Sequence, residues 1–281
     1  MSGIIQKLSD QTASEAWRGF ENIYGNFGPP LTPSDEDRRF VEAAIADWVA
    51  CHPGERLRAV LLGVTPGIVA AGWPGGSFLI AVERSKAIIR SVWPGNIPAV
   101  RWAVEGDWLS LPVRAGTLDI AVGDGSLSAL SYPGGYRRLA RAFREKLRPG
   151  GILVLRAYVP PAAPEDPRHV MAELPRHATF HQFKLRLLMA LQESPEEGTH
   201  LAEVYRYWSA YGIDRAALAA ETRWRREEID TIDRYRDLDG TYTFPPLDEL
   251  RALLGESFSQ MRVLVPSYPL GECCPTLVMR P

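Results

Sequence analysis

The sequence predicts an α/β protein with a mostly parallel sheet that is covered by helices on both faces. Five short apolar runs, at 59–62, 78–82, 100–104, 118–122 and 152–155, alternate with helical patterns. Continuous apolar runs of this length are typical of strands that are buried on both faces. Right-handed crossovers place the C-terminal ends of such strands along one edge, where ligands bind. We therefore expect the glycine and acidic residues that follow the first four runs to form a binding site.

The composition is that of one large globular domain, or of one domain that carries an insertion. The chain has 281 residues, of which 46% are hydrophobic and 23% charged, so it can build a substantial core. A net charge of -2 without a dominant basic run predicts a small-molecule substrate and no nucleic-acid partner. Cys51, Cys273 and Cys274 lack the number and spacing of a disulfide framework and are expected to be free thiols.

The sequence has neither the apolar run of a signal peptide nor one of membrane-spanning length. We therefore expect a cytoplasmic protein with no membrane partner. The oligomeric state stays open.

Helical regions flank the alternating core. Ser34 precedes three acidic residues and a helical apolar pattern, which predicts a helix start. A proline-rich linker at 160–164 leads into long helical patterns, and a helix and two strands are expected to end the chain. The expected organisation is an N-terminal helical cap at 1–50, a cofactor-binding core at 51–160, a helical insertion or substrate cap at 161–240, and a final part at 241–281 that completes the sheet.

The turn after the first apolar run has the residue types of a nucleotide-binding loop. Gly63 and Gly67 flank Thr65 and Pro66, and glycine lets the backbone approach a ligand at the start of a helix. Glu83 ends the second run, where a carboxylate can accept both hydroxyls of a ribose. A surface glutamate explains Glu83 alone equally well, but the two features together favour a nucleoside site.

Three segments of the core resemble motifs of class I S-adenosylmethionine-dependent methyltransferases. They are EGDWLSLP at 105–112, GTLDIAV at 116–122 and LRPGGIL at 147–153. The resemblance implies a seven-stranded, mostly parallel, doubly wound sheet with an antiparallel last strand, an N-terminal helical segment and a helical insertion after the fifth strand. It implies S-adenosylmethionine as the cofactor, with Asp107 at the adenine amino group and the amide of Trp108 at a ring nitrogen. The implied cofactor-binding residues are Gly63, Thr65, Pro66, Gly67, Glu83, Arg84, Gly106, Asp107, Trp108, Asp124 and Gly125.

The sequence departs from this family at two positions. Leu61 stands where the family usually has an acid, and Thr65 replaces the central glycine. These departures motivate an alternative, a non-catalytic S-adenosylmethionine-binding or regulatory protein of the same fold. An NAD-dependent oxidoreductase is disfavoured, because its glycine pattern requires glycine where Thr65 and Ile68 stand.

Three residues are candidates for the chemistry of methyl transfer, which requires an aligned acceptor and in some cases a base. Asp124 is the first candidate for a catalytic or substrate-orienting group. Its alternatives are to cap the next helix or to bind the amino group of the cofactor. Tyr158 either lines the same pocket or packs as a core aromatic, and His181 is a candidate base.

Two further patterns favour structural interpretations. His169, His177 and His181 have helical spacing, but Pro175 interrupts any single helix, so we expect no metal site. Trp17 and Tyr24 could fold over the cofactor, although aromatic residues on a helix usually pack in a core.

Overall fold

The described chain contains a seven-stranded sheet with one antiparallel strand. A computed structural model describes residues 24–97 and 100–281. The strands are β1 (Arg58–Leu62), β2 (Phe78–Glu83), β3 (Arg101–Glu105), β4 (Leu118–Asp124), β5 (Leu147–Arg156), β8 (Gln260–Leu264) and β9 (Thr276–Arg280). They follow the order β3-β2-β1-β4-β5-β9-β8, and β9 is antiparallel to both of its neighbours. This order confirms the predicted mostly parallel, doubly wound sheet.

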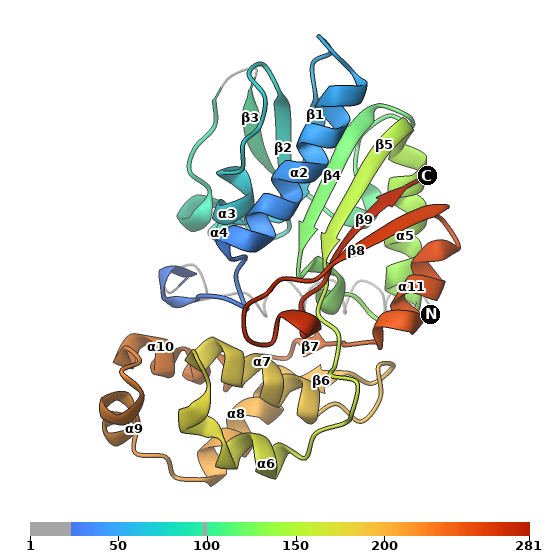
Figure 1. Cartoon of the computed structure of the whole chain (residues 1–281). Helices are drawn as coiled ribbons and strands as arrows, with labels where there is room; N and C mark the ends of the chain where they lie inside the picture. Colours follow the sequence, from blue (N-terminus) through green and yellow to red (C-terminus); the bar gives the residue numbers. More distant parts are fainter. Residues whose placement is uncertain (1–23, 98–99) are drawn as a thin grey trace, which may run out of the picture.

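Helices cover both faces of the sheet (Figure 1). They are α2 (Asp35–Cys51), α3 (Pro66–Val69), α4 (Lys86–Val92), α5 (Gly134–Lys146) and α11 (Leu247–Gly255). Successive side chains of a strand point to opposite faces, so Leu61 packs in the buried cluster of Trp48 on α2, whereas Leu62 packs in that of Phe143 on α5. The strands are thus buried on both sides, as their continuous apolar runs predict.

Helix α2 begins where the sequence predicts. The Ser34 hydroxyl accepts a hydrogen bond from the Asp37 amide at 3.2 Å, and the Asp37 carboxylate accepts one from the Ser34 amide at 2.8 Å. This reciprocal pair is a capping box, which satisfies amide groups that the first turn leaves without partners. The preceding chain forms a short 3₁₀ turn, η1 (Tyr24–Asn26). Trp17 and the side chain of Tyr24 lie outside the described residues, so their proposed contact with a cofactor stays a prediction.

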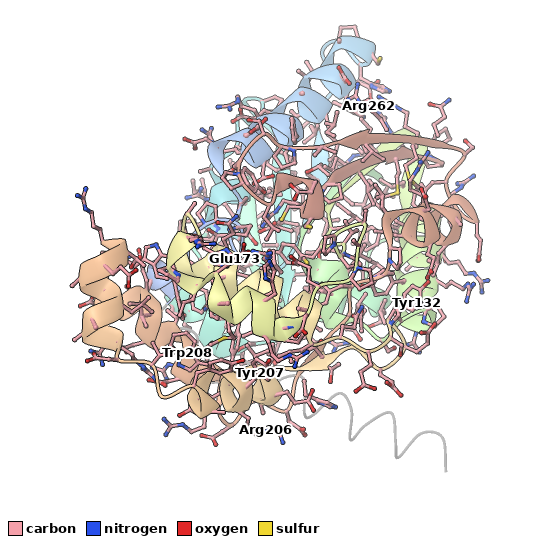
Figure 2. All side chains as sticks on the ribbon, turned by 60° about the horizontal axis from the view of Figure 1, so that its bottom comes forward. Tyr132, Glu173, Arg206, Tyr207, Trp208 and Arg262 are labelled. Atoms are coloured by element: carbon pink, nitrogen blue, oxygen red, sulfur yellow. The ribbon has the colours of Figure 1, made fainter. Side chains whose placement is uncertain are left out.

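The helical insertion follows β5. Its elements are α6 (Pro167–Ala172), η4 (Leu174–Arg176), α7 (Phe180–Ala190), α8 (Leu201–Ala210), α9 (Arg215–Thr222), α10 (Arg226–Asp230) and η5 (Thr231–Tyr235). Phe180 and Phe183 of α7 pack against Trp208 of α8, with ring centroids 5.4 and 5.5 Å apart. Arg206 of the same helix is exposed, whereas Tyr207 is half-buried against this core (Figure 2). Aromatic packing therefore gives the insertion a core of its own.

The insertion also contains a small antiparallel sheet that the sequence analysis missed. Its strands are β6 (Thr199–His200) and β7 (Thr241–Tyr242). Two residues are too few to display the alternation by which a strand is recognised. The pairing therefore depends on contact between segments forty residues apart.

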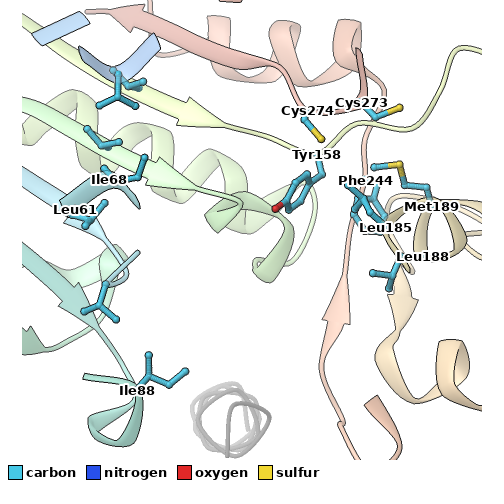
Figure 3. Packing of buried hydrophobic residues seen from close by; sticks show 14 of the residues in the cluster. Leu61, Ile68, Ile88, Tyr158, Leu185, Leu188, Met189, Phe244, Cys273 and Cys274 are labelled. Atoms are coloured by element: carbon cyan, nitrogen blue, oxygen red, sulfur yellow. The ribbon is translucent and has the colours of Figure 1, made fainter. Parts of the chain in front are cut away.

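One buried apolar cluster joins the insertion to the sheet (Figure 3). It includes Leu61 and Ile88 of the α/β core, Leu188 and Met189 of α7, and Tyr158, which lies between them. The insertion consequently rests against the C-terminal ends of the parallel strands. All three cysteines are free thiols, as predicted. Among the described residues, no helix has both the length and the apolar character needed to cross a membrane.

Candidate functional site

A pocket lies at the C-terminal ends of β1, β2 and β4. The helical insertion lies next to these strand ends (Figure 1). The predicted cofactor-binding residues that line it are Gly63, Thr65, Glu83, Arg84, Trp108, Asp124 and Gly125. The others, which lie outside the lining, are Pro66, Gly67, Gly106 and Asp107. Side chains from four separate turns are thus brought together at one edge of the sheet.

The turn after β1 depends on the backbone freedom of Gly63. Its φ is +91°, a left-handed conformation that favours glycine. Its amide donates a hydrogen bond to the Val82 carbonyl at 2.8 Å, which ties the turn to β2. The side chain of Thr65 makes no capping hydrogen bond at the start of α3 although it lines the pocket. Gly67 instead packs against Pro33, where an added Cβ would lie 3.0 Å from a ring carbon.

Glu83 lies at the end of β2, beside the turn. One carboxylate oxygen accepts a hydrogen bond from the Ser85 amide at 2.9 Å. The other lies 3.8 Å from the position of an ideal Cβ on Gly63. Burial raises the pKa of Glu83, while the amides of Ser85 and Arg84 oppose that rise. A carboxylate thus lies directly beside the glycine turn in the pocket lining.

The segment after β3 supplies a fixed aromatic wall. The Trp108 indole donates a hydrogen bond to the Val82 carbonyl at 2.7 Å and its ring lines the pocket. Asp107 uses one oxygen to accept from the Leu109 amide at 2.9 Å and the other to pair with Arg84 at 2.8 Å. Gly106 packs against Val82. The Asp107 carboxylate is therefore already engaged within the protein.

The end of β4 brings a charged residue and a serine into the pocket lining. Gly125 has a φ of +62°, and an added Cβ would lie 2.9 Å from a ring carbon of Tyr158. Next to it, the buried hydroxyl of Ser126 has no hydrogen-bond partner among the described residues. A buried polar group without a partner is uncommon and calls for a ligand or a water molecule. Asp124 lines the same region.

Arg156, the last residue of β5, holds the side chains of Asp124 and Tyr158 in place through hydrogen bonds. Its guanidinium donates to the Asp124 carboxylate at 2.5 Å, to the Pro30 carbonyl at 2.9 Å and to the Tyr158 hydroxyl at 3.1 Å. The side chains of Arg156 and Asp124 are only 4% and 7% exposed. Burial raises the pKa of Asp124, and the positive charge of Arg156 opposes that rise. Asp124 is therefore held in a buried ion pair.

Of the two other catalytic candidates, one lines the pocket and the other does not. Tyr158 lines it and donates its hydroxyl proton to the Pro30 carbonyl at 3.0 Å. Burial raises the pKa of Tyr158 well above its usual value. His181 is absent from the lining and stacks on Phe27 with ring centroids 5.5 Å apart. Burial, and then the charge of Lys184, lower the pKa of His181 to about 3.

No cluster of three or more histidine, cysteine, aspartate or glutamate side chains that could hold a metal ion occurs within residues 24–97 and 100–281. His169 of α6 pairs with Glu173, which directly follows that helix, whereas His177 packs near Phe183. The helically spaced histidines thus have separate environments.

Apolar and aromatic side chains complete the pocket lining. They are Phe27, Leu31, Tyr158, Tyr235 and Tyr242, of which only Tyr158 was predicted from the sequence. Aromatic residues in a helical insertion resemble core residues in sequence, so no local signal distinguishes them. Arg156 was not predicted as a site residue. Its position directly after the apolar run 152–155 is a detectable signal, because a charged residue that is buried at a strand end needs a buried partner.

Comparisons with known proteins concern the fold alone. No protein-family model matches the sequence, and no curated protein matches it. A solved structure from Rhodobacter sphaeroides, provisionally named a Zn-dependent alcohol dehydrogenase, is similar with a TM-score of 0.61 and 12% identity over 96% of this chain and 97% of that chain. The CurJ carbon methyltransferase is similar with a TM-score of 0.53 and 13% identity over 99% of this chain and 68% of that chain.

Proposed function

The chain has a class I methyltransferase-like fold, and on this premise we propose that it is an S-adenosylmethionine-dependent methyltransferase with a small-molecule acceptor. One observation carries the proposal: the Gly63 turn, Glu83 and Trp108 follow three different strands and line one pocket. The strand order adds support, because the antiparallel β9 beside β5 differs from the parallel sheet of dinucleotide-binding proteins.

The residues of the pocket fit a nucleoside with an amino-acid tail. The Trp108 ring would form a wall for the adenine, and Glu83 would accept the ribose hydroxyls. The backbone at Gly63 and Thr65 would approach the methionine end, where the unpaired Ser126 hydroxyl offers a further partner. Asp107 would serve indirectly, since its carboxylate holds Arg84 and the turn of Trp108 in place.

S-adenosylmethionine would supply a methyl group on a positively charged sulfur. The protein would contribute alignment of the acceptor and exclusion of water. Asp124 would act as an orienting hydrogen-bond acceptor, because its ion pair with Arg156 leaves it poorly suited to remove a proton. Tyr158 would shape the pocket wall, since its raised pKa disfavours the phenolate. His181, which lies outside the pocket lining, has no part in this proposal.

Calorimetry with S-adenosylmethionine, its demethylated product S-adenosylhomocysteine and NAD tests the proposal. We expect micromolar binding of the first two and none of NAD. Glu83→Ala should weaken cofactor binding at least about tenfold through loss of charge-assisted hydrogen bonds. Glu105→Ala is the matched control, because Glu105 ends the neighbouring strand β3 but lies outside the pocket lining. Binding of NAD alone would overturn the proposal.

A second candidate function is cofactor binding without catalysis. Leu61, which is fully buried, replaces the usual acid at the methionine end, and Thr65 replaces a glycine. The two functions differ in turnover. Formation of S-adenosylhomocysteine with any member of an acceptor panel would support the enzyme, whereas tight binding without product across a broad panel would support the binding protein.

A further inference from the structure

We propose that the acceptor bound in this pocket is a planar aromatic molecule without a positive charge. This inference rests on the proposed function. It starts from a division within the pocket: the charged lining residues Glu83, Arg84 and Asp124 all lie at strand ends, whereas the opposite wall is built from apolar and aromatic side chains.

The aromatic wall comes from three parts of the chain. Phe27 belongs to the loop before α2, Tyr235 ends η5, and Tyr242 lies in β7. Leu31 and Leu130 add apolar surface. Aromatic side chains favour stacked or edge-to-face contact with another ring, which adds to the free energy of burying apolar surface. A flat, unsaturated ligand therefore matches this wall better than a flexible polar one.

A positive charge would find no free counter-ion at this wall. None of its side chains is acidic, and the adjacent Asp124 is already paired with Arg156 at 2.5 Å. Glu83 is the remaining carboxylate of the lining and lies on the side of the proposed ribose site. Burying an ammonium group without a partner costs several kcal/mol, so an amine cation would bind poorly here.

Lys184 lies behind this wall, outside the pocket lining. It is fully buried on α7, and its amine donates a hydrogen bond to the Thr231 hydroxyl at 2.7 Å. Its nitrogen lies 4.3 Å from the ring centroid of Phe27 and 5.0 Å from that of Tyr235. Within residues 24–97 and 100–281, no carboxylate forms an ion pair with it, and burial lowers its pKa.

Both protonation states of Lys184 disfavour a cationic acceptor. A charged Lys184 already occupies two of the rings that would attract a cation, and it would repel a second positive charge. A neutral Lys184 would be a buried amine behind the same two rings and would offer an acceptor cation no counter-ion.

Two naphthalene derivatives of nearly equal shape test the inference. 1-Naphthalenemethanol is uncharged, whereas 1-naphthylmethylamine carries a positive charge at pH 7. We expect the full chain with S-adenosylhomocysteine bound to bind the alcohol at least about tenfold more tightly than the amine in calorimetry. Equal or tighter binding of the amine would overturn the inference, and so would failure of both compounds to bind while S-adenosylhomocysteine binds.

Variants locate the bound ring. Tyr235→Leu and Phe27→Leu should each weaken binding of the alcohol at least about fivefold while S-adenosylhomocysteine binding, which reports an intact fold, stays unchanged. Tyr211→Ala is the control, because Tyr211 is exposed and lies outside the pocket lining. Unchanged affinity for the alcohol in both leucine variants would overturn the inference. If S-adenosylhomocysteine does not bind to the unmodified protein, the proposed function fails, and the two naphthalenes measured alone still decide the charge preference.

Discussion

Replacing Arg156 with methionine should destabilise the protein strongly. The variant keeps an apolar stem of similar length but removes the hydrogen bonds to Asp124, Pro30 and Tyr158. Because Asp124 is only 7% exposed, its carboxylate would stay buried without its partner. Breaking a buried ion pair in this way costs about 3–5 kcal/mol. An exposed pair provides the comparison: Arg137 and Glu256 are each 42% exposed, so Arg137→Met should cost under about 1 kcal/mol.

The loss should depend on pH and on Asp124. Burial already raises the folded-state pKa of Asp124 above 3.8, and removing Arg156 raises it further. The variant therefore suffers its full loss above that raised pKa. The charge-dependent part of the loss shrinks as the pH falls below that value, and it is gone once the pH is also below the folded-state pKa of Asp124 in the unmodified protein. In an Asp124→Asn background, the same replacement should cost about 2 kcal/mol less, because only the more distant Asp37 carboxylate, 3.7 Å from the Arg156 guanidinium, then loses its partner.

Urea unfolding followed by tryptophan fluorescence measures these differences, since the chain has 8 tryptophans. The unmodified protein, Arg156→Met, Asp124→Asn, the double variant and the control Arg137→Met are compared at pH 7 and at pH 5. The reasoning is refuted if Arg156→Met costs no more than Arg137→Met. It is refuted equally if the cost is the same with and without Asp124→Asn.

Three further predictions follow from single side chains. Glu83→Gln should weaken S-adenosylmethionine binding about tenfold at pH 7 in calorimetry. Because burial raises the pKa of Glu83 above 4.5, the unmodified protein should lose cofactor affinity as the pH falls through that raised value, whereas the variant should not. Gly125→Ala should lower both stability and cofactor affinity, because Gly125 has a left-handed backbone and the added Cβ would lie 2.9 Å from a ring carbon of Tyr158. Gly116→Ala is the control: Gly116 has a similar φ of +64° but no neighbour within 4 Å of the added Cβ, so thermal unfolding should show only the backbone strain of about 1–2 kcal/mol. Lys184→Met should stabilise the protein by about 1–3 kcal/mol. Because the folded-state pKa of Lys184 is lowered, this gain in stability should be largest at acid pH and should fade as the pH rises from the folded-state pKa toward 10.5. A variant that unfolds at lower urea concentration than the unmodified protein would contradict this prediction.

The fold and half of the pocket could be predicted because they depend on local pattern. Continuous apolar runs record burial on both faces, and residues that follow such runs must lie at the ligand edge of a parallel sheet. Gly63, Glu83 and Trp108 line the pocket for that reason. Asp107 shows the limit of this reasoning, since its sequence position does not reveal that Arg84 and the Leu109 amide already occupy its carboxylate.

The sequence by itself determined the seven strands of the main sheet, the helices between them and the glycine and acidic residues that end the first four strands, because each follows from apolar periodicity or from the geometry of a turn. Only the tertiary structure decided what faces those strand ends and which charges are paired. Tyr235 joins the pocket, Arg156 neutralises Asp124, and Lys184 is buried behind Phe27 through contacts between segments far apart in the chain. Such contacts depend on how the insertion packs against the sheet, and local sequence pattern carries no record of that packing.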